Sequence, residues 1–232
     1  MKISVEFLIS HDRFGFNRSN SPYFNITKRI LIIKTTSIFL ARHGETEWNL
    51  EERLQGNKNS PLTENGIDQA KKAGEILANS EIDVVYSSPL KRAVNTARII
   101  LDGRNTELII RDGLREIHLG PWEGKTKKET EISHPEEYIN FWYYPDRYHL
   151  KGGETYRDLQ KRVVEEIQNI FDENRGKTIL IVSHWIAIKT AIAFFLGKPL
   201  KKLNDTANLS NGSILQLSMI DGKVKVSASP LC

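Results

Sequence analysis

SIFLARHGET, residues 37–46, is the stretch of the sequence that decides the fold class. A mostly apolar run that ends in a sharply polar stretch is typical of a buried parallel strand whose carboxyl end opens into a loop. Open α/β sheets bind their ligands at that edge. Arg42 and His43 lie there side by side, followed by Gly44, which lets backbone come close. These residues suit an oxyanion such as phosphate, so we expect an anion site at this edge.

Strand-like and helix-like segments alternate outward from this stretch. The expected strands, each a short apolar run, cover residues 37–41, 83–87, 107–110 and 178–183. The expected helices, each with an apolar stripe, cover about 63–77, 88–101, 154–173 and 186–196. Thr63 and Ser88 are expected N-caps, and Pro89 is expected at the first helical position. The alternation predicts a three-layer α/β/α sandwich around a mostly parallel sheet.

The two ends of the chain and residues 111–153 fit this alternation less clearly. The first 33 residues mix Asn, Ser, Arg and Phe without a clear period, so we treat 1–33 as an appendage and 34–232 as the domain. Residues 111–153 are polar and aromatic, and they predict short helices and loops over one edge of the sheet. Residues 213–219 and 223–227 predict a hairpin that turns at Asp221-Gly222.

Composition argues against several classes of protein. The net charge is +4, but the two signs are interspersed, so we do not expect a nucleic-acid binder. No apolar stretch reaches the roughly 18 residues that a membrane span needs. The single cysteine, Cys232, cannot form an internal disulfide, and no signal peptide is evident, so we expect a cytoplasmic protein. No glycine-rich phosphate loop follows a strand, which argues against a nucleotide-binding domain.

Three of the expected strands lead into basic residues that would meet at one edge of the sheet. The first strand leads to Arg42 and His43, the second to Arg92, and the fourth to His184. Arg92 lies in the first turn of an expected helix, where the positive end of the macrodipole disfavours a cation. A residue that breaks a local rule in this way is a candidate functional residue. The alternative to a functional role for Arg92 is an exposed arginine paired with a surface carboxylate. The alternative for His184 is a buried structural histidine.

Two histidines and two arginines at one edge would form an electropositive pocket for a phosphoryl group. One imidazole can attack phosphorus, and the guanidiniums can hold the equatorial oxygens. A metal site is the competing use of the histidines. Arginines beside a cation would repel it, and Glu116-Ile117-His118 offers only one weak ligand pair, so we expect neither a metal nor a cofactor.

Five motifs, in order, resemble the histidine phosphatase, or phosphoglycerate mutase-like, superfamily, and most of all its broad-specificity bacterial phosphatases. They are RHGETxWN at 42–49, PLTExG at 61–66, SSPLxRA at 87–93, LREIxLGxWEG at 114–124 and VSH at 182–184. The resemblance runs from about Lys34 to about Met219. The resemblance implies that the expected α/β/α sandwich has the phosphoglycerate mutase-like fold.

The resemblance also implies roles for individual residues. His43 is similar to the family nucleophile, which forms a phosphohistidine, and Glu116 to the general acid that later activates water. Arg42, Arg92 and His184 match the rest of the phosphate pocket. Three further residues match positions that bind substrate in the family: Asn49, Gln55 and Gly56. A backbone carbonyl near Gly44 is the expected acceptor that orients His43.

One position departs from the family pattern, because Trp185 follows the second histidine where relatives usually have glycine. We count Trp185 among the substrate-binding candidates. Its indole either narrows the pocket or points away and packs into the sheet, and we favour the packing alternative. Residues 134–150 hold a cluster of aromatic side chains, which forms either a lid over the pocket or a small satellite core.

The resemblance implies a metal-independent phosphomonoester hydrolase that acts on a small phosphorylated metabolite. The compact section between Glu116 and Gly153 favours a phosphatase over the alternative, phosphoglycerate-mutase-type transfer. A non-catalytic phospho-ligand binder is the third alternative, and Trp185 is the one feature in its favour. The terminal hairpin could leave an edge through which a homodimer forms.

Overall fold

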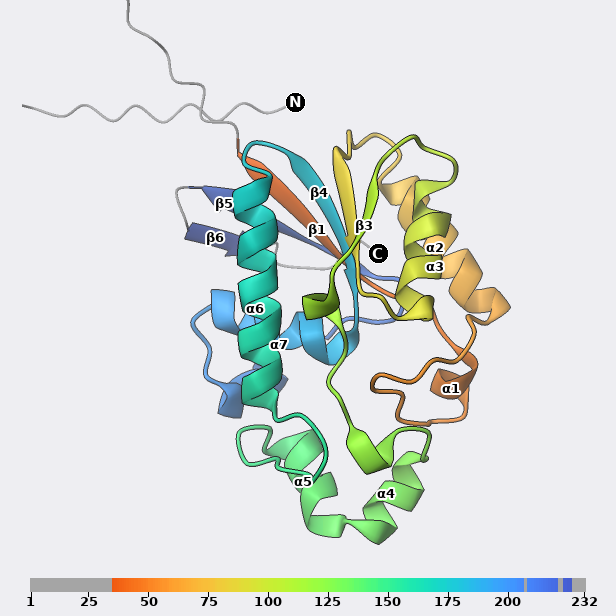
Figure 1. Ribbon diagram of the computed structural model, residues 1–232, viewed down its shortest axis with the longest axis vertical. Helices are drawn as coiled ribbons and strands as arrows, with labels where there is room; N and C mark the ends of the chain where they lie inside the picture. Colours follow the sequence, from red (N-terminus) through yellow and green to blue (C-terminus); the bar gives the residue numbers. More distant parts are fainter. Residues whose placement is uncertain (1–34, 207, 221–222, 227–232) are drawn as a thin grey trace, which may run out of the picture. The chain divides into compact units, whose positions relative to one another are not determined.

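The computed structural model of the chain describes residues 35–206, 208–220 and 223–226. Its centre is a six-stranded sheet in the order β3-β2-β4-β1-β5-β6 (Figure 1). The strands are β1 (Thr36–Arg42), β2 (Val84–Ser87), β3 (Leu108–Ile110), β4 (Thr178–Ser183), β5 (Ile214–Ile220) and β6 (Lys223–Val226). β1 to β4 run parallel to one another, whereas β5 pairs antiparallel with β1 and β6 pairs antiparallel with β5. The prediction of a mostly parallel sheet is confirmed.

Helices cover both faces of the sheet, as the alternation predicts (Figure 1). The α-helices are α1 (Glu47–Leu50), α2 (Glu64–Ile76), α3 (Lys91–Leu101), α4 (Lys127–Ser133), α5 (Pro135–Tyr143), α6 (Tyr156–Glu173) and α7 (Trp185–Phe195). Three 3-10 turns, η1 (Asp112–Leu114), η2 (Gly120–Trp122) and η3 (Leu200–Asp205), complete the helical elements. α2 and α3 pack on one face, and α6 and α7 pack on the other.

Strand β1 shows why the chain forms three layers. Ile38 and Leu40 belong to the apolar cluster under α6 and α7, whereas Phe39 and Ala41 belong to the cluster under α2 and α3. Successive side chains of a strand point to opposite faces, so a strand that is apolar throughout must be covered on both sides. The run at residues 37–41 therefore predicts two helical layers, and this prediction is confirmed.

Helix α3 begins later than the sequence predicts. Its first residue is Lys91 and its N-cap is Leu90, so Ser88 is not the cap and Pro89 is not the first helical residue. The Ser88 hydroxyl accepts a long hydrogen bond from the Leu90 N–H at 3.3 Å and lies 2.8 Å from Nε2 of His184. The prediction of Ser88 as the N-cap was wrong because the Ser88 hydroxyl makes a tertiary contact with His184. The predicted cap at Thr63 is confirmed, since its hydroxyl accepts from the Gly66 N–H at 2.9 Å.

Residues 111–153 form the expected short helices and loops, with α4 and α5 at one end of the domain (Figure 1). Their core is aromatic: Phe141 contacts Trp122, Tyr148 and Tyr156 with ring centroids 5.0–5.6 Å apart. All four side chains are buried. These rings belong to the same apolar cluster as Ile38 and Leu40 of β1, so they extend the main core and the predicted separate satellite core is not formed.

Several sequence-based predictions fall outside the described residues. The appendage at 1–33, the turn at Asp221-Gly222 and the terminal Cys232 lie there, so the boundary between appendage and domain stays a prediction. β5 and β6 pair antiparallel, as expected for the hairpin. Within the described ranges, no helix has both the length and the apolar character that a membrane crossing requires.

Candidate active site

The pairing of β1 with β4 brings the two candidate histidines together. The strands are parallel neighbours, and Arg42 is in register with Ser183, so the residues that follow, His43 and His184, leave the sheet at the same edge. Their ring centroids are 5.2 Å apart. The His43 N–H donates to the Ser183 carbonyl at 3.0 Å, which continues the ladder by one residue. The sequence-based prediction that these histidines meet is confirmed.

Two hydrogen bonds define the tautomer of His43. Nδ1 lies 2.7 Å from the Gly44 carbonyl oxygen, and a carbonyl can only accept, so Nδ1 carries the proton. Nε2 accepts from the Nε–H of Arg92 at 3.3 Å, so Nε2 presents a lone pair. Burial, followed by the charges of Arg92 and Arg42, lowers the pKa of His43 well below its usual range. His43 is therefore neutral near pH 7, with Nε2 available as a nucleophile.

Arg92 is buried on the first turn of α3, with 1% of its surface exposed. Besides His43, its guanidinium donates to the carbonyls of Gly56 at 2.7 Å and Lys58 at 2.5 Å. Burial lowers the pKa of Arg92 to about 10, so it remains a cation near neutral pH. The alternative of an exposed arginine paired with a surface carboxylate is excluded by this burial.

Arg42 supplies a second cation at the same edge. Its Nη1 donates to the Leu209 carbonyl at 2.6 Å, and its Nε is buried without a hydrogen-bond partner. Burial lowers the pKa of Arg42 to about 10. Within the described part of the chain, neither Arg42 nor Arg92 forms an ion pair with a carboxylate. One buried and one partly buried cation, with no carboxylate in ion-pair contact, favour the binding of an anion.

His184 is fully buried behind His43. Its Nε2 and the Ser88 hydroxyl are 2.8 Å apart and share a hydrogen bond. Its Nδ1 is buried and has no hydrogen-bond partner among the described residues. Burial, and then the charge of Arg92, lowers the pKa of His184 well below its usual range. His184 is thus neutral in the anion-free site, with one ring nitrogen unpaired.

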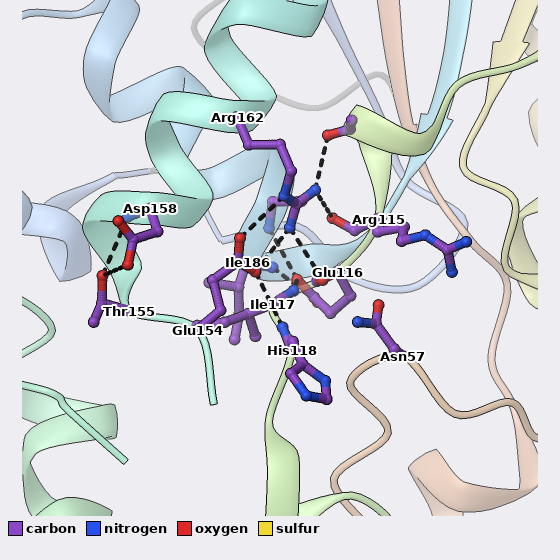
Figure 2. A network of polar contacts seen from close by, with 12 residues as sticks. Asn57, Arg115, Glu116, Ile117, His118, Glu154, Thr155, Asp158, Arg162 and Ile186 are labelled. Carbon is purple, nitrogen blue, oxygen red and sulfur yellow. Dashed lines mark hydrogen bonds and ion pairs between the residues drawn. The ribbon is translucent and has the colours of Figure 1, made fainter. Parts of the chain in front are cut away.

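Glu116 lies at the amino end of α7, reaching it from the loop after η1. Its carboxylate accepts from the N–H groups of Ile117, Ile186 and Ala187 at 2.9, 3.2 and 3.1 Å, and Figure 2 shows it beside the first two of these residues. These bonds favour the ionised form, but burial outweighs them, and the pKa of Glu116 is raised. A buried carboxyl with a raised pKa can carry a proton for a leaving group.

The three predicted substrate-binding residues before Glu116 are brought to the same cavity. The Asn49 Oδ1 accepts from the N–H and the hydroxyl of Thr46, both at 3.0 Å, and this contact closes a capping box on α1. The Gln55 amide donates to the same hydroxyl at 2.6 Å, and its Oε1 is buried without a partner. Gly56 has a φ of 51°, a conformation that glycine adopts readily, and its carbonyl binds Arg92.

A cavity of about 280 Å³ opens at this edge. Seven of the predicted site residues line it: Arg42, His43, Asn49, Gln55, Gly56, Glu116 and Trp185. Arg92 and His184, the other two, are buried against His43, behind the residues that line the cavity. The structure therefore brings all nine predicted site residues to one place.

Trp185 forms a wall of the cavity, so the favoured expectation that it points away from the pocket is wrong, although its ring also packs against the core. Its indole N–H donates to Oδ1 of Asn208 at 2.9 Å, and its ring lies 5.9 Å from that of Trp142. The Arg42 guanidinium is 5.8 Å from the ring centroid, and the Lys189 ammonium is 5.2 Å from it. These contacts hold the indole at the cavity because its N–H and its face both find partners there.

Sequence reasoning missed several residues of the site. Trp48 lines the cavity and was not predicted to do so. Phe141 and Trp142 belong to the aromatic cluster at 134–150, and they line the cavity, as the lid alternative expected, while packing with the main core. Thr96 accepts the Gly44 N–H at 3.0 Å, and its position one helical turn after Arg92 is a signal that the sequence carries. Asn208 lies in an irregular segment near the end of the chain, and no local pattern indicates it.

No group of three or more His, Cys, Asp or Glu side chains is arranged to hold a metal ion within the ranges that the structure describes. The arginines at the cavity favour an anion instead.

Comparison with known proteins shows which family the chain resembles. The model of the histidine phosphatase superfamily (branch 1) matches residues 38–229. Phosphoserine phosphatase 1 of Hydrogenobacter thermophilus is 33% identical over 165 residues, which are 71% of this chain and 78% of the relative. Phosphoglycerate mutase-like protein 4 of Arabidopsis thaliana is 38% identical over 157 residues, or 66% of this chain and 68% of the relative.

Solved structures of other proteins are also similar to this chain in fold. YhfR of Bacillus stearothermophilus superposes with a TM-score of 0.81 at 39% identity, covering 83% of this chain and 95% of that chain. The chain belongs to the histidine phosphatase superfamily. As a member, it is an enzyme of the phosphatase class, whose chemistry is phosphoryl hydrolysis or transfer.

Proposed function

We propose that this protein hydrolyses phosphomonoesters through a phosphohistidine on His43, with Glu116 as the general acid and base and without a metal ion. Nε2 of His43 attacks phosphorus, and the bond from phosphorus to the ester oxygen breaks. The proton of the Glu116 carboxyl goes to the leaving oxygen, which departs as an alcohol. Water then attacks the phosphohistidine, gives its proton to Glu116, and releases phosphate and free His43.

One observation carries this proposal. Arg92 is buried and Arg42 is partly buried, and within the described residues neither forms an ion pair with a carboxylate. Both lie beside a neutral histidine whose Nε2 carries no proton. Cations in that position stabilise the oxygens of a phosphoryl group during its transfer and leave the nucleophile uncharged. Glu116, with a raised pKa, lines the same cavity and supports the role of proton donor.

Hydrolysis is favoured over mutase-type transfer by the motif at residues 114–126, which resembles that of the bacterial phosphatases. A relative named as a phosphoserine phosphatase supports the same choice, although another relative is named as mutase-like. The two activities differ in whether water reaches the phosphohistidine, so they are separated by the product that is released.

The substrate in this proposal is a small phosphorylated metabolite of the cytoplasm, with a leaving group that contacts an aromatic wall. A cavity of about 280 Å³ suits a compact leaving group beside the phosphate. Trp142 and Trp185 line one side of it, and the rings give a flat surface for an aromatic or partly apolar group.

The test is release of inorganic phosphate in EDTA from p-nitrophenyl phosphate, phosphoserine, 3-phosphoglycerate and a sugar phosphate. Wild type is compared with His43→Ala and with His118→Ala, a matched variant of a histidine that lies beside the site but bonds Glu123 instead. We expect release by wild type and His118→Ala and none by His43→Ala. A phosphoryl label on His43, stable in base and lost in acid, is the expected intermediate.

Three results would contradict the proposal. Loss of activity in EDTA that returns with a metal would contradict metal independence. Interconversion of 3- and 2-phosphoglycerate without phosphate release would show transfer rather than hydrolysis. Binding of the substrates without any turnover would identify a phospho-ligand binder, the remaining alternative for this scaffold.

A further inference from the structure

The segment that carries Glu116 has an unusual need for hydrogen-bond partners. Residues 115–119 lie between η1 and η2 and belong to no helix or strand, so neighbouring turns of a helix or rungs of a sheet do not satisfy their backbone groups. Glu116 and Ile117 in this segment are nevertheless buried. Buried irregular backbone holds one position only if side chains from elsewhere bind its carbonyl and N–H groups.

Arg162 of α6 binds the carbonyl side of this segment. Its Nη1 donates to the carbonyls of Gly113 at 2.9 Å and Arg115 at 3.1 Å, and its Nη2 reaches the carbonyl of Glu116 at 3.4 Å. Figure 2 shows the guanidinium directed at this backbone. A planar guanidinium can bind several acceptors in one fixed arrangement, which a lysine ammonium cannot reproduce.

Glu154 binds the other side of the segment. Its Oε2 accepts the His118 N–H at 3.1 Å, and its own N–H donates to the His118 carbonyl at 2.7 Å. The Glu154 carboxylate also pairs with both Nε and Nη2 of Arg162, at 3.0 and 2.8 Å. The two side chains therefore form one unit that holds the backbone before, at and after Glu116 (Figure 2).

We propose that Arg162 and Glu154 are positioning residues, which act through Glu116 to aim its carboxyl at the leaving oxygen. This inference rests on the proposed function of Glu116 as proton donor. The carboxyl is held on its far side by the N–H groups of Ile186 and Ala187, so its place in the cavity requires that its own backbone be held as well. Loss of the Arg162 contacts frees the backbone while the carboxyl keeps its α7 partners.

Arg111 provides a matched control for loss of an ion pair on α6. It pairs with Glu173 and, at 3.8 Å, with Glu166, both on that helix. Its side chain is 31% exposed, against 28% for Arg162. Among the described contacts, its side chain touches nothing in residues 115–118. Replacing it removes an arginine of similar burial and leaves the Glu116 segment intact.

The experiment measures kcat/KM on an alkyl phosphate and on p-nitrophenyl phosphate for wild type, Arg162→Met, Glu154→Gln and Arg111→Met. An alkoxide needs a proton from Glu116 in order to leave, whereas nitrophenolate leaves as a stable anion. We expect Arg162→Met to lower kcat/KM on the alkyl ester by about 10- to 100-fold, as a small misplacement of a catalytic group does. The aryl ester should lose much less, and Arg111→Met should leave the ratio unchanged.

A double-mutant cycle with Glu116→Gln tests whether Arg162 acts through Glu116. We expect Arg162→Met to have little further effect on the alkyl ester once Glu116 is replaced. Equal losses on both esters, additive effects in the cycle, or the same change in Arg111→Met would overturn the proposal and leave a purely structural ion pair. If Arg162→Met does not fold, Glu154→Gln carries the same test, because it removes the pair and keeps the guanidinium.

Failure of this inference is distinct from failure of the proposed function. If His43→Ala and Glu116→Gln both keep full activity, the phosphohistidine mechanism is wrong. If those variants are impaired while Arg162→Met retains the wild-type ratio of alkyl to aryl activity, the mechanism stands and the positioning role is wrong.

Discussion

The Nε–H of Arg92 donates to Nε2 of His43 at 3.3 Å, while Nδ1 of the same imidazole bonds the Gly44 carbonyl at 2.7 Å. The ring is therefore oriented from both sides, and the nitrogen that would attack phosphorus faces a cation. Burial, and then the positive charge of Arg92, lowers the pKa of His43 and keeps the histidine neutral. The arrangement also places a guanidinium where phosphate oxygens would arrive.

Arg92→Lys is expected to lower kcat/KM by about 100-fold or more, a loss typical of removing one transition-state donor. Lysine retains the charge but cannot bind the Gly56 and Lys58 carbonyls and His43 from one planar group. Steady-state kinetics on p-nitrophenyl phosphate measures the effect. Arg98→Lys, an exposed position on the same helix, is the control. Near wild-type activity of Arg92→Lys would show that charge alone suffices.

The value of kcat/KM for an alkyl phosphate is expected to decrease as the pH rises. Glu116 must carry a proton, and burial raises its pKa above 4.5, so activity is lost as pH rises through that raised pKa. His43 must be unprotonated, and its pKa is lowered from 6.5, so activity persists well below pH 6.5. Glu116→Gln should remove the basic limb and lower the plateau. Glu52→Gln, an exposed carboxylate at the cavity, is the control, and a basic limb that survives in Glu116→Gln would assign it to another group.

Trp185→Gly is expected to widen the range of leaving groups. The indole is a cavity wall held by Asn208, so its removal adds space next to Arg42. The ratio of kcat/KM for a bulky phosphomonoester to that for a small one should rise several-fold. Asn208→Ala, which frees the indole but leaves it in place, should shift the ratio in the same direction by less. A ratio that stays constant in both variants would show that this wall does not select substrates.

Trp142→Ala is expected to reduce the preference for aryl over sugar phosphates by about two- to tenfold, the value of a contact between aromatic rings. Trp142 lines the cavity next to Trp185. Relative kcat/KM on p-nitrophenyl phosphate and a sugar phosphate measures the change. Tyr144→Ala, an exposed aromatic residue just after α5 and outside the cavity, should have no effect. Equal loss on both substrates would assign Trp142 to stability rather than to binding.

Gly44→Ala is expected to reduce both stability and activity. A Cβ at this position would lie 2.3 Å from the Gly66 carbonyl oxygen, so the backbone of the 43–45 loop must move. Such overpacking costs about 1–3 kcal/mol of unfolding free energy, and movement of the Gly44 carbonyl releases Nδ1 of His43. Denaturant melts and kinetics measure the two effects. Gly103→Ala, where nothing lies within 4 Å but φ is +76°, controls for backbone strain and should leave activity unchanged.

The fold and much of the site were predictable from local pattern. Residues 37–41 and 178–183 are apolar throughout, and only strands covered on both faces tolerate that. Because two such strands run parallel, the polar residues after them, His43 and His184, must share one edge. Arg92 was predictable because it violates the charge preference of a helix amino end.

Other parts of the site could not be predicted, because they depend on which distant segments meet. The start of α3 was misplaced since the Ser88 hydroxyl bonds His184, 96 residues away in the chain. The side on which Trp185 lies is decided by Asn208 and Trp142, which no sequence spacing connects to it. Gly44 and Gly66 are both glycine because their backbones touch, a contact that neither position shows alone.

The sequence by itself determined the layered sheet, the edge at which the site lies and the residue types that collect there. These follow from periodicity and from the direction of strands, which act over a few residues at a time. The tertiary structure alone decided the burial that raises the pKa of Glu116 and the support of its backbone by Arg162 and Glu154. Hydrogen bonding and desolvation depend on what surrounds a group in space, and chain order does not specify those surroundings.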